Sequence, residues 1–274
     1  MDGDLVLETP KHKLRVKRKD DVWELISVGD LEFQGSALSL LKTDEFHPGL
    51  GLLKEYALSL QSLELLNPQD MKRRAREGGD PGSGGERLAG YLHGLKPPER
   101  LELERLLREF YSGLQGMEVK SFRGGWKELI ATEGWGTRPL KTRARHLNDG
   151  MLRMIAILSQ TQLLTANSKP ARCILFDEIE NGINPELVRK LIEILLKSPN
   201  QIIVTTHSPM ILNWLPDEVA RESVILLYRD EPGTTKAARM FDLPTASKRL
   251  GVLGPGEVFV DVDLAQLALE AEQG

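Results

Sequence analysis

The stretch CILFDEIENG, residues 173–182, places an apolar run directly before two adjacent carboxylates, Asp177 and Glu178. The run is typical of a buried strand, and the acids follow where that strand ends. Neighbouring carboxylates repel each other and resist burial, so the pair has an electrostatic cost. In phosphoryl transfer the pair becomes useful, because one carboxylate can hold Mg²⁺ while the other polarises the attacking water. Taken alone, the pattern also fits an ordinary strand exit with solvated acids.

The sequence after this stretch alternates between helix and strand. NPELVRKLIEILLK (184–197) has helical spacing, with Asn184 as the cap and Pro185 at the first helical position. QIIVTTH (201–207) is a second continuous apolar run, which predicts another buried strand. Strands of this kind joined by a helix are expected to lie parallel in an α/β fold.

Polar residues follow both predicted strands. Asp177 and Glu178 end the first strand, and His207 ends the second, just before a helix that Ser208 is placed to cap. Ligands bind beyond the carboxyl ends of the strands in a parallel sheet. We therefore expect the two acids and the histidine at one edge of the sheet.

Length, charge and cysteine content narrow the class of protein. The chain of 274 residues and 30.7 kDa is long enough for one large α/β domain or two small ones. Its net charge of -4 and pI near 5.8 exclude a surface built as a whole for nucleic acid, so any DNA contact must be local. The single cysteine, Cys173, excludes an internal disulfide and indicates a cytoplasmic protein. No signal peptide or membrane span is expected.

The regions outside the two strands have distinct patterns. Residues 1–50 alternate polar and apolar side chains, which predicts edge strands, including one at LEFQG (31–35). Residues 51–118 are expected to form a helical insertion or arm: residues 52–65 have helical spacing, and an amphipathic helix pair could project from the core.

Residues 119–274 are expected to form the main lobe. GMEVKSF (116–122), at its boundary, and KELIAT (127–132) read as strands, whereas the basic RPLKTRAR (138–145) reads as mobile. A helix is predicted from Asn148 onward. GEVFVDVD (256–263) reads as a final strand.

Four motifs in order resemble those of the ABC-type ATPases of the RecF, SMC and OLD group within the AAA family. LNDGMLR (147–153) looks like their signature motif, CILFDE (173–178) like their Walker B strand, IENGINP (179–185) like their D-loop, and TTHSP (205–209) like their switch histidine. The resemblance implies a parallel-sheet P-loop NTPase lobe with a helical insertion and N-terminal edge strands. It further implies that the chain is part of an ATP hydrolase that uses Mg²⁺ and forms a homodimer through the signature motif.

The resemblance also implies roles for the polar residues that follow the strands. Asp177 would hold Mg²⁺, and Glu178 would act as the general base toward the attacking water. His207 would contact the γ-phosphate as a sensor. A lone histidine is more often structural, but the position after an apolar strand favours the sensor.

The signature segment would bind the nucleotide that a second subunit holds. Asn148, Asp149 and Gly150 lie at a helix start, where free N–H groups and the helix dipole suit a γ-phosphate. Simple capping is the alternative. Relatives commonly have serine in place of Asn148, and asparagine caps helices equally well. Arg153, one turn later, could support the phosphate site or pair with an acid.

A P-loop of the form G-x-x-x-x-G-K-[ST] does not occur in the sequence. The nearest segment, GDPGSGGE (79–86), has Gly85 and Glu86 where the motif needs Lys and Ser or Thr, and it follows the basic MKRRARE (71–77). We read it as a flexible loop. In the resembling ATPases the P-loop lies near the N-terminus, so we expect the P-loop portion to be absent from this chain and supplied from outside it.

Two functions stay open at this point. The first is the C-terminal part of an ATP-binding and ATP-hydrolysing enzyme coupled to DNA repair, DNA maintenance or phage defence, with DNA or a partner protein as further partners. The second is a non-catalytic regulatory or interaction module that has lost nucleotide capture. The intact acids, glycine and histidine favour the first, and the missing P-loop favours the second.

Overall fold

The computed structural model describes residues 7–8, 13–17, 22–27, 48–64, 68–134, 138–161 and 173–273. The strand predicted at residues 31–35 therefore lies outside the described residues. Within them, no helix is both long enough and apolar enough to cross a membrane.

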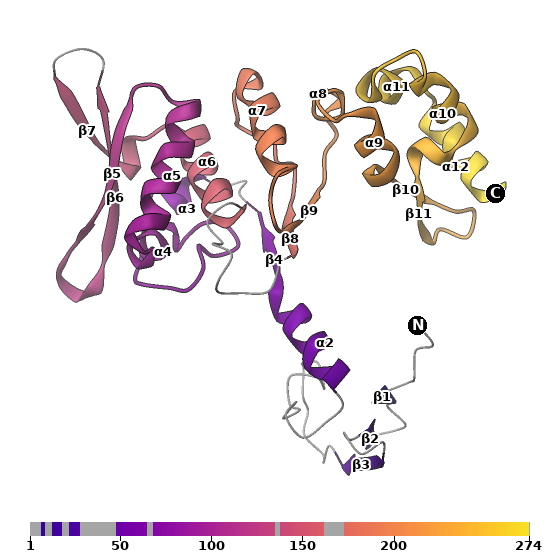
Figure 1. Ribbon diagram of the computed structural model, residues 1–274, viewed down its shortest axis with the longest axis horizontal. Coiled ribbons are helices and arrows are strands. Elements are labelled where there is room, and N and C mark those ends of the chain that lie inside the picture. Colours follow the sequence, from indigo (N-terminus) through magenta and orange to yellow (C-terminus); the bar gives the residue numbers. More distant parts are fainter. Residues whose placement is uncertain are drawn as a thin grey trace.

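A parallel sheet occupies the middle of the molecule, in the order β4-β8-β9 (Figure 1). It consists of β4 (Leu60–Leu63), β8 (Cys173–Phe176) and β9 (Gln201–Val204). β8 pairs in parallel with both neighbours, and α7 (Pro185–Leu195) connects it to β9. The predicted α/β fold with parallel strands is thus confirmed.

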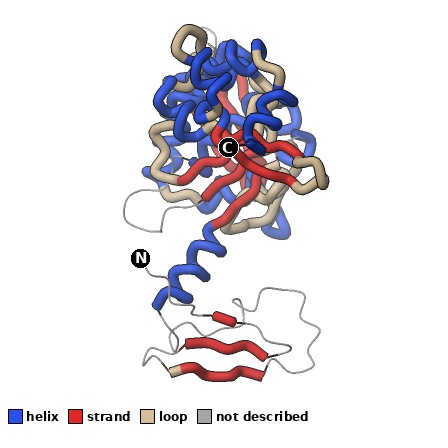
Figure 2. The backbone as a smooth tube through the Cα atoms, turned by 90° about the vertical axis from the view of Figure 1, so that its right-hand side faces the viewer, coloured by secondary structure: helices blue, strands red, loops and turns tan. Residues whose placement is uncertain are grey.

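The helix predicted over residues 52–65 ends earlier than expected. α2 (Pro48–Ser59) gives way directly to β4, and in Figure 2 the helix runs into the sheet without a break. The prediction is wrong for Leu60–Leu63, because pairing with β8 outweighs the helical spacing of four residues. A segment assigned to the helical insertion thus contributes a strand to the central sheet.

Helices on one side of the sheet form the main hydrophobic core. They are α3 (Pro68–Met71), α4 (Leu88–Gly94), α5 (Pro97–Phe110) and α6 (Asp149–Thr161). α6 is central, since every residue from position 151 to position 161 is buried. The amphipathic helices α4 and α5 pack into the same core, so they do not project as an arm.

A second, antiparallel sheet lies beyond these helices, at the left of Figure 1. It contains β5 (Leu114–Ser121), β6 (Lys127–Gly134) and β7 (Pro139–Arg143) in that order. The first two strands were predicted. β7 corrects the expectation that residues 138–145 are mobile, because its backbone pairs along β6 while most of its side chains stay exposed. A 3₁₀ turn, Ala144–His146, then leads into α6.

The C-terminal part has a hydrophobic core of its own, which includes Phe241 and Val258. Its elements are α8 (Pro209–Asn213), α9 (Asp217–Ser223), β10 (Ile225–Arg229), β11 (Thr235–Arg239), α10 (Pro244–Leu250), α11 (Pro255–Asp261) and α12 (Leu264–Gln273). The strand predicted at residues 256–263 is wrong. That segment is largely α11, whose start is held by Asn213 Oδ1, which accepts from the backbone N–H of Gly256 at 2.9 Å.

The described N-terminal strands form a separate antiparallel sheet in the order β1-β2-β3. They are β1 (Leu7–Glu8), β2 (Lys13–Lys17) and β3 (Trp23–Ser27). Figure 2 places them at the opposite end of α2 from the parallel sheet. They are therefore strands, as predicted, but not edge strands of the central sheet.

Candidate functional site

Thr205 ties the carboxyl ends of β8 and β9 together. Its backbone N–H donates to the carbonyl of Phe176 at 2.9 Å, which continues the pairing of the two strands by one residue. Its hydroxyl donates to Asp177 Oδ1 and accepts from the backbone N–H of Glu178 at 3.0 Å. The expected meeting of the two strand ends is confirmed, and β9 orients the acids that follow β8.

Glu178 has a backbone conformation that few residues adopt. Its φ of 45° lies in the left-handed region, and it is the one non-glycine residue with a positive φ in the described part of the chain. This conformation costs about 1–2 kcal/mol for a residue with a Cβ. Asn181 holds the turn: its side chain donates to the Glu178 carboxylate, and its N–H donates to the Glu178 carbonyl at 2.9 Å. Such strain is typical of functional sites, where surrounding contacts over-determine the backbone.

A second threonine braces the loop after β9. Thr206 Oγ1 donates to Glu180 Oε1 at 2.7 Å and accepts from the backbone N–H of Ser208 at 2.9 Å. His207 lies between these two anchored positions with an exposed side chain, and its ring makes no hydrogen bond to any described residue. The imidazole is therefore held in place by its backbone and stays accessible to a ligand.

α6, which contains most of the predicted signature segment, is capped by Asn148, the alternative that the sequence left open for this residue. Asn148 Oδ1 accepts from the backbone N–H of Met151 at 2.6 Å. The Asp149 side chain pairs with Lys72, its Oδ1 lying 2.7 Å from Nζ, and its contact with a nucleotide stays a prediction. This ion pair ties the start of α6 to the segment after α3. Asp149 is therefore engaged within the fold, while its backbone N–H belongs to the helix start.

Two glycines bring the signature segment against the turn after β8. A Cβ added to Gly150 would lie 2.9 Å from the carbonyl oxygen of Gly182. Gly182 has a φ of 69°, and a Cβ there would lie 3.2 Å from Nε of Arg153. Both positions therefore require glycine, one for close backbone approach and one also for the left-handed conformation. Sequence reasoning anticipated Gly150 but missed Gly182, although Asn-Gly is a recognised turn signal.

Arg153 is buried and faces this turn. Its Nη1 donates to the Asn181 carbonyl at 2.5 Å, and the residue is 7% exposed. Burial lowers the pKa of Arg153, and the nearby Asp149 partly opposes that shift. The two roles expected for Arg153, support of a phosphate site or pairing with an acid, stay predictions, and the hydrogen bond to Asn181 adds a third role. The guanidinium stabilises the turn that carries Glu178.

Tyr111 is a further neighbour of this site, and no sequence pattern pointed to it. Its hydroxyl lies 3.7 Å from the position of a Cβ on Gly150. Burial raises the pKa of Tyr111 to about 12, so the side chain is a neutral phenol at physiological pH. It adds a hydrogen-bonding group beside the start of α6.

The hollows near these residues are small. Arg153, Phe176, Asp177 and Glu178 line a cavity of about 10 Å³, the size that one water molecule needs. A larger hollow of about 510 Å³ lies elsewhere, between the end of α2, β4 and the loop 79–83. The cavity at the acidic pair is therefore far smaller than a nucleotide.

The donor set at the strand ends suits a magnesium ion held mainly by water and phosphate. The described residues contain no group of three or more histidine, cysteine or acidic side chains that could hold a metal. Mg²⁺ is usually bound by one or two carboxylates together with waters and substrate phosphates. Asp177, exposed and anchored by Thr205 through one oxygen, fits this mode.

Comparison with known families gives one match, over residues 127–213. The matching family is described as "AAA domain, putative AbiEii toxin, Type IV TA system". The matched region begins with β6 and contains β7, α6, β8, α7, β9 and α8. No curated protein matches the sequence.

Comparison with solved structures gives heads of SMC ATPases at low identity. One comes from a study of "ATP-driven dimerization and DNA stimulated activation of SMC ATPases". It is 16% identical with a TM-score of 0.38, and the match covers 51% of this chain and 81% of that chain. An Smc head from Pyrococcus furiosus bound to the C-terminal domain of ScpA is 16% identical with a TM-score of 0.39, covering 51% and 34%. A third, from Pyrococcus yayanosii, has the same identity and TM-score and covers 51% and 26%.

Proposed function

We propose that residues 127–213, which match the AAA-domain family, are part of an ABC/SMC-like AAA ATPase, and that the carboxyl ends of β8 and β9 hold the phosphates of ATP for hydrolysis. The observation that carries the proposal is the shared anchoring of Asp177 and Glu178 by Thr205, which fixes both acids at the edge where parallel sheets bind ligands. We further propose that the protein acts in the cytoplasm, on DNA or on a partner protein.

Asp177 is the residue that would hold Mg²⁺. When bound, the ion supplies charge neutralisation for the phosphate oxygens. Thr205 fixes the carboxylate by a hydrogen bond to one oxygen, so the other oxygen would be available to hold the ion. Asp177→Asn is expected to weaken nucleotide retention and Mg²⁺ dependence together.

Glu178 is the proposed general base. A carboxylate in this role needs to be fixed within hydrogen-bonding reach of the attacking water. The left-handed backbone of Glu178 and the contact from Asn181 provide that fixation from within the turn. His207, exposed after β9, would donate from its ring to a γ-phosphate oxygen.

A further strand along β9 would complete the site. β9 has a partner on one side only in the described sheet, and its apolar side chains are not fully covered: Ile203 is 43% exposed. Continuous apolar strands are typical of parallel sheets with both faces buried. We propose that a parallel strand carrying a P-loop pairs with this edge and brings backbone N–H groups to the β-phosphate.

The chain of 274 residues alone should therefore bind ATP poorly. Titration calorimetry with Mg-ATP is expected to give an affinity weaker than about millimolar, because P-loop amides and the P-loop lysine provide most of the phosphate contacts. Micromolar binding by this chain would contradict the proposed strand. The coding sequence around this reading frame, searched for a strand followed by G-x-x-x-x-G-K-[ST], identifies the segment to add.

The start of α6 is proposed to act on the nucleotide of a second copy. Asn148 and Asp149 are exposed at this helix start, where N–H groups and the dipole favour an anion. Light scattering of the Glu178→Gln protein, completed by its P-loop, should detect a dimer with ATP and a monomer without it. A monomer in both conditions would contradict dimerisation through this helix.

Two substitutions test the dimer contact, and they differ in how much each is expected to disturb the fold. Gly150→Asp should abolish the dimer, but it would also meet the Gly182 carbonyl and could disturb the turn. Arg145→Glu changes an exposed residue just before α6 and should weaken the dimer by phosphate repulsion without unfolding. Lys197→Glu, an exposed charge reversal after α7, is the matched control. If the Arg145 and Lys197 variants weaken the dimer equally, the start of α6 does not contact a phosphate of the second copy.

The second candidate is a regulatory or interaction module without catalysis. It is favoured by the small cavity at the acids and by the lack of a P-loop motif in residues 1–274. The two functions separate in one experiment: with the P-loop segment added, an enzyme releases phosphate and loses that activity in Glu178→Gln. A module releases no phosphate above the background of the variant.

A further inference from the structure

A patch of cations and aromatic rings lies at the turn between β5 and β6, far in the sequence from the strand ends of the central sheet. Its residues come from the segment after α3 and from that turn. We call it the basic–aromatic patch, and it consists of Arg74, Arg76, Lys120, Phe122, Arg123 and Trp126. All of these residues except Phe122 are exposed, and Phe122 is half-buried.

Backbone pairing fixes the two segments of the patch against each other. Ala75 and Lys127 form an antiparallel bridge, with N–H···O distances of 3.1 and 2.8 Å. Phe122 N–H donates to the Trp126 carbonyl at 2.8 Å and closes the turn, which needs positive φ at Gly124 and Gly125. The patch is thus pre-organised, which lowers the entropy lost when a ligand binds.

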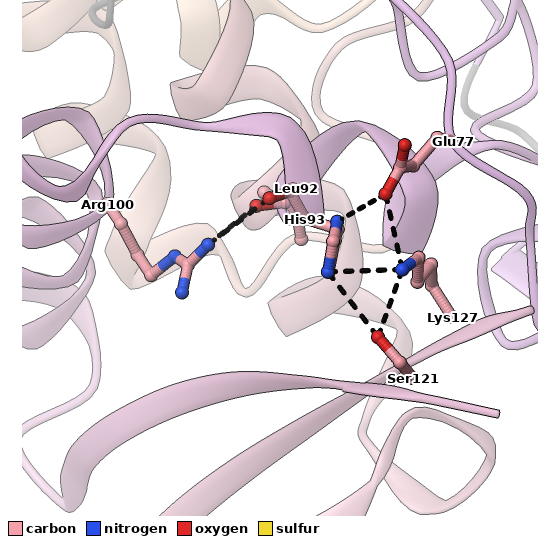
Figure 3. A network of polar contacts seen from close by, with 6 residues as sticks. All are labelled: Glu77, Leu92, His93, Arg100, Ser121 and Lys127. Atoms are coloured by element: carbon pink, nitrogen blue, oxygen red, sulfur yellow. Dashed lines mark hydrogen bonds and ion pairs between the residues drawn. The ribbon is translucent and has the colours of Figure 1, made fainter. Parts of the chain in front are cut away.

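A polar network beside the patch strengthens this anchoring (Figure 3). Lys127 Nζ lies 3.2 Å from Glu77 Oε1, 3.0 Å from Ser121 Oγ and 3.1 Å from His93 Nε2. His93 Nδ1 contacts the same Glu77 oxygen at 2.8 Å. Lys127 and, to a smaller extent, His93 lower the pKa of Glu77. The one acid next to Arg76 in the chain is therefore engaged by Lys127 and His93.

The network has the side chains of a Ser–His–Glu triad but not its chemistry. Ser121 Oγ lies 3.4 Å from His93 Nε2, the nitrogen that would take its proton. Lys127 Nζ lies closer to that nitrogen, at 3.1 Å, than Ser121 Oγ does. An ammonium at this position competes with Ser121 for the lone pair that a general base needs, so we interpret the network as structural.

The rings of the patch hold cations without neutralising them. The guanidinium of Arg74 lies 3.8 Å from the centre of the Phe122 ring, and that of Arg76 lies 5.3 Å from the Trp126 ring. Lys120 Nζ lies 5.7 Å from the Phe122 ring. These distances are within the range of cation–π contacts. The positive charges stay available to an anion.

Few acids offset these charges. Arg74 pairs with Glu128 at 3.3 Å, but Arg76, Lys120 and Arg123 form no ion pair within the described residues. The chain as a whole carries a net charge of -4. A local excess of positive charge on an acidic protein indicates a surface for a particular anion, since whole-surface attraction is excluded.

We propose that the basic–aromatic patch binds single-stranded nucleic acid. Cations spaced across a pre-organised turn contact successive phosphates, and the exposed ring of Trp126 offers a face on which an unpaired base can stack. A duplex keeps its bases stacked and cannot use that ring. An acidic peptide or an anionic membrane would use the charges alone.

Fluorescence anisotropy with a labelled oligo-dT of about 20 nucleotides tests the proposal in the absence of ATP. The wild-type chain should bind with a dissociation constant of about 1–100 µM at physiological salt, and more tightly at lower salt. Arg76→Ala/Lys120→Ala/Arg123→Ala should weaken binding and lower the slope of log K against log salt by about 2, at roughly 0.7 for each phosphate that the protein no longer neutralises. Trp126→Ala should weaken binding about tenfold with little change of slope, and Trp126→Phe should retain most of the affinity.

The control is Lys197→Ala/Arg229→Ala/Lys248→Ala, which removes the same number of exposed charges outside the patch. Circular dichroism verifies that each variant is folded. Binding lost equally in both triple variants, or no binding by the wild type, would overturn the proposal. Tighter binding of a matched duplex, of polyglutamate or of phosphatidylserine vesicles, unaffected by Trp126→Ala, would also overturn it.

Discussion

The strands β8 and β9 have similar apolar sequences but very different burial. In β8, Ile174 is 0% exposed and Phe176 is 2% exposed. In β9, Ile203 is 43% exposed, and the exposed and half-buried positions alternate. Within the described residues, β8 lies between two parallel neighbours, whereas β9 has one.

The two strands show that an apolar sequence indicates a strand that can be buried, but does not indicate which elements bury it. β9 carries the sequence of a central strand and occupies an edge of the described sheet. Exposed apolar edges favour pairing with another strand. This is the physical reason for proposing a further strand at β9 and none at β8. It also corrects the expectation that residues 201–207 form a buried strand.

Matched isoleucine substitutions are the strongest test of the difference in burial between β8 and β9. Ile174→Ala should reduce the free energy of unfolding by about 2–5 kcal/mol, because it opens a cavity in the core. Ile203→Ala should cost about 1 kcal/mol or less, since its side chain is already partly in water. Urea unfolding of the 274-residue chain measures both. Equal losses would mean that β9 is buried as deeply as β8.

The turn after β8 offers a second test, because α6 packs on it. Gly150→Ala should cost about 1–3 kcal/mol, as its Cβ would meet the Gly182 carbonyl at 2.9 Å. Gly94→Ala is the control, since a Cβ there meets nothing within 4 Å. That control should be neutral or slightly stabilising. A neutral Gly150→Ala, measured by thermal unfolding, would show that α6 and the turn are not in close contact.

Substitutions at the starts of the helices that follow β8 and β9 are expected to have the smallest effect on stability. Asn184 Oδ1 accepts from the backbone N–H of Glu186 at 3.1 Å at the start of α7, whereas Ser208 makes no such cap at the start of α8. Asn184→Ala should therefore cost about 1 kcal/mol and Ser208→Ala a few tenths. Denaturant midpoints of the two variants compare the caps. A larger loss of stability for Ser208→Ala than for Asn184→Ala would contradict the assignment of Asn184 as the stronger cap.

Sequence reasoning succeeded where local signals and packing agree. β8, α7 and the cap at Asn184 were predicted because apolar runs, proline at the first helical turn and a polar cap point to the same structure. It failed at Leu60–Leu63 and at residues 138–145, where pairing with a distant strand decides the conformation. It failed at residues 256–263 because Asn213 provides the helix start from another element.

The candidate site also combines features that the sequence could predict with features that it could not. Asp177, Glu178 and His207 could be predicted at one edge, since parallel strands align their carboxyl ends. The contact between Gly150 and Gly182 joins residues on different elements and could not be predicted from either motif alone. The ion pair of Asp149 with Lys72 likewise depends on how α6 packs against the segment after α3.

The most direct test of the account is the Glu178→Gln variant of the protein completed by its P-loop, with ATP binding and phosphate release measured on the same preparation. We expect ATP to be retained and hydrolysis to fall by about 10² or more, because the amide keeps the shape of the side chain but cannot accept the proton of water. Equal loss of binding and turnover, or unchanged turnover, would contradict the role of the β8 and β9 strand ends in ATP hydrolysis.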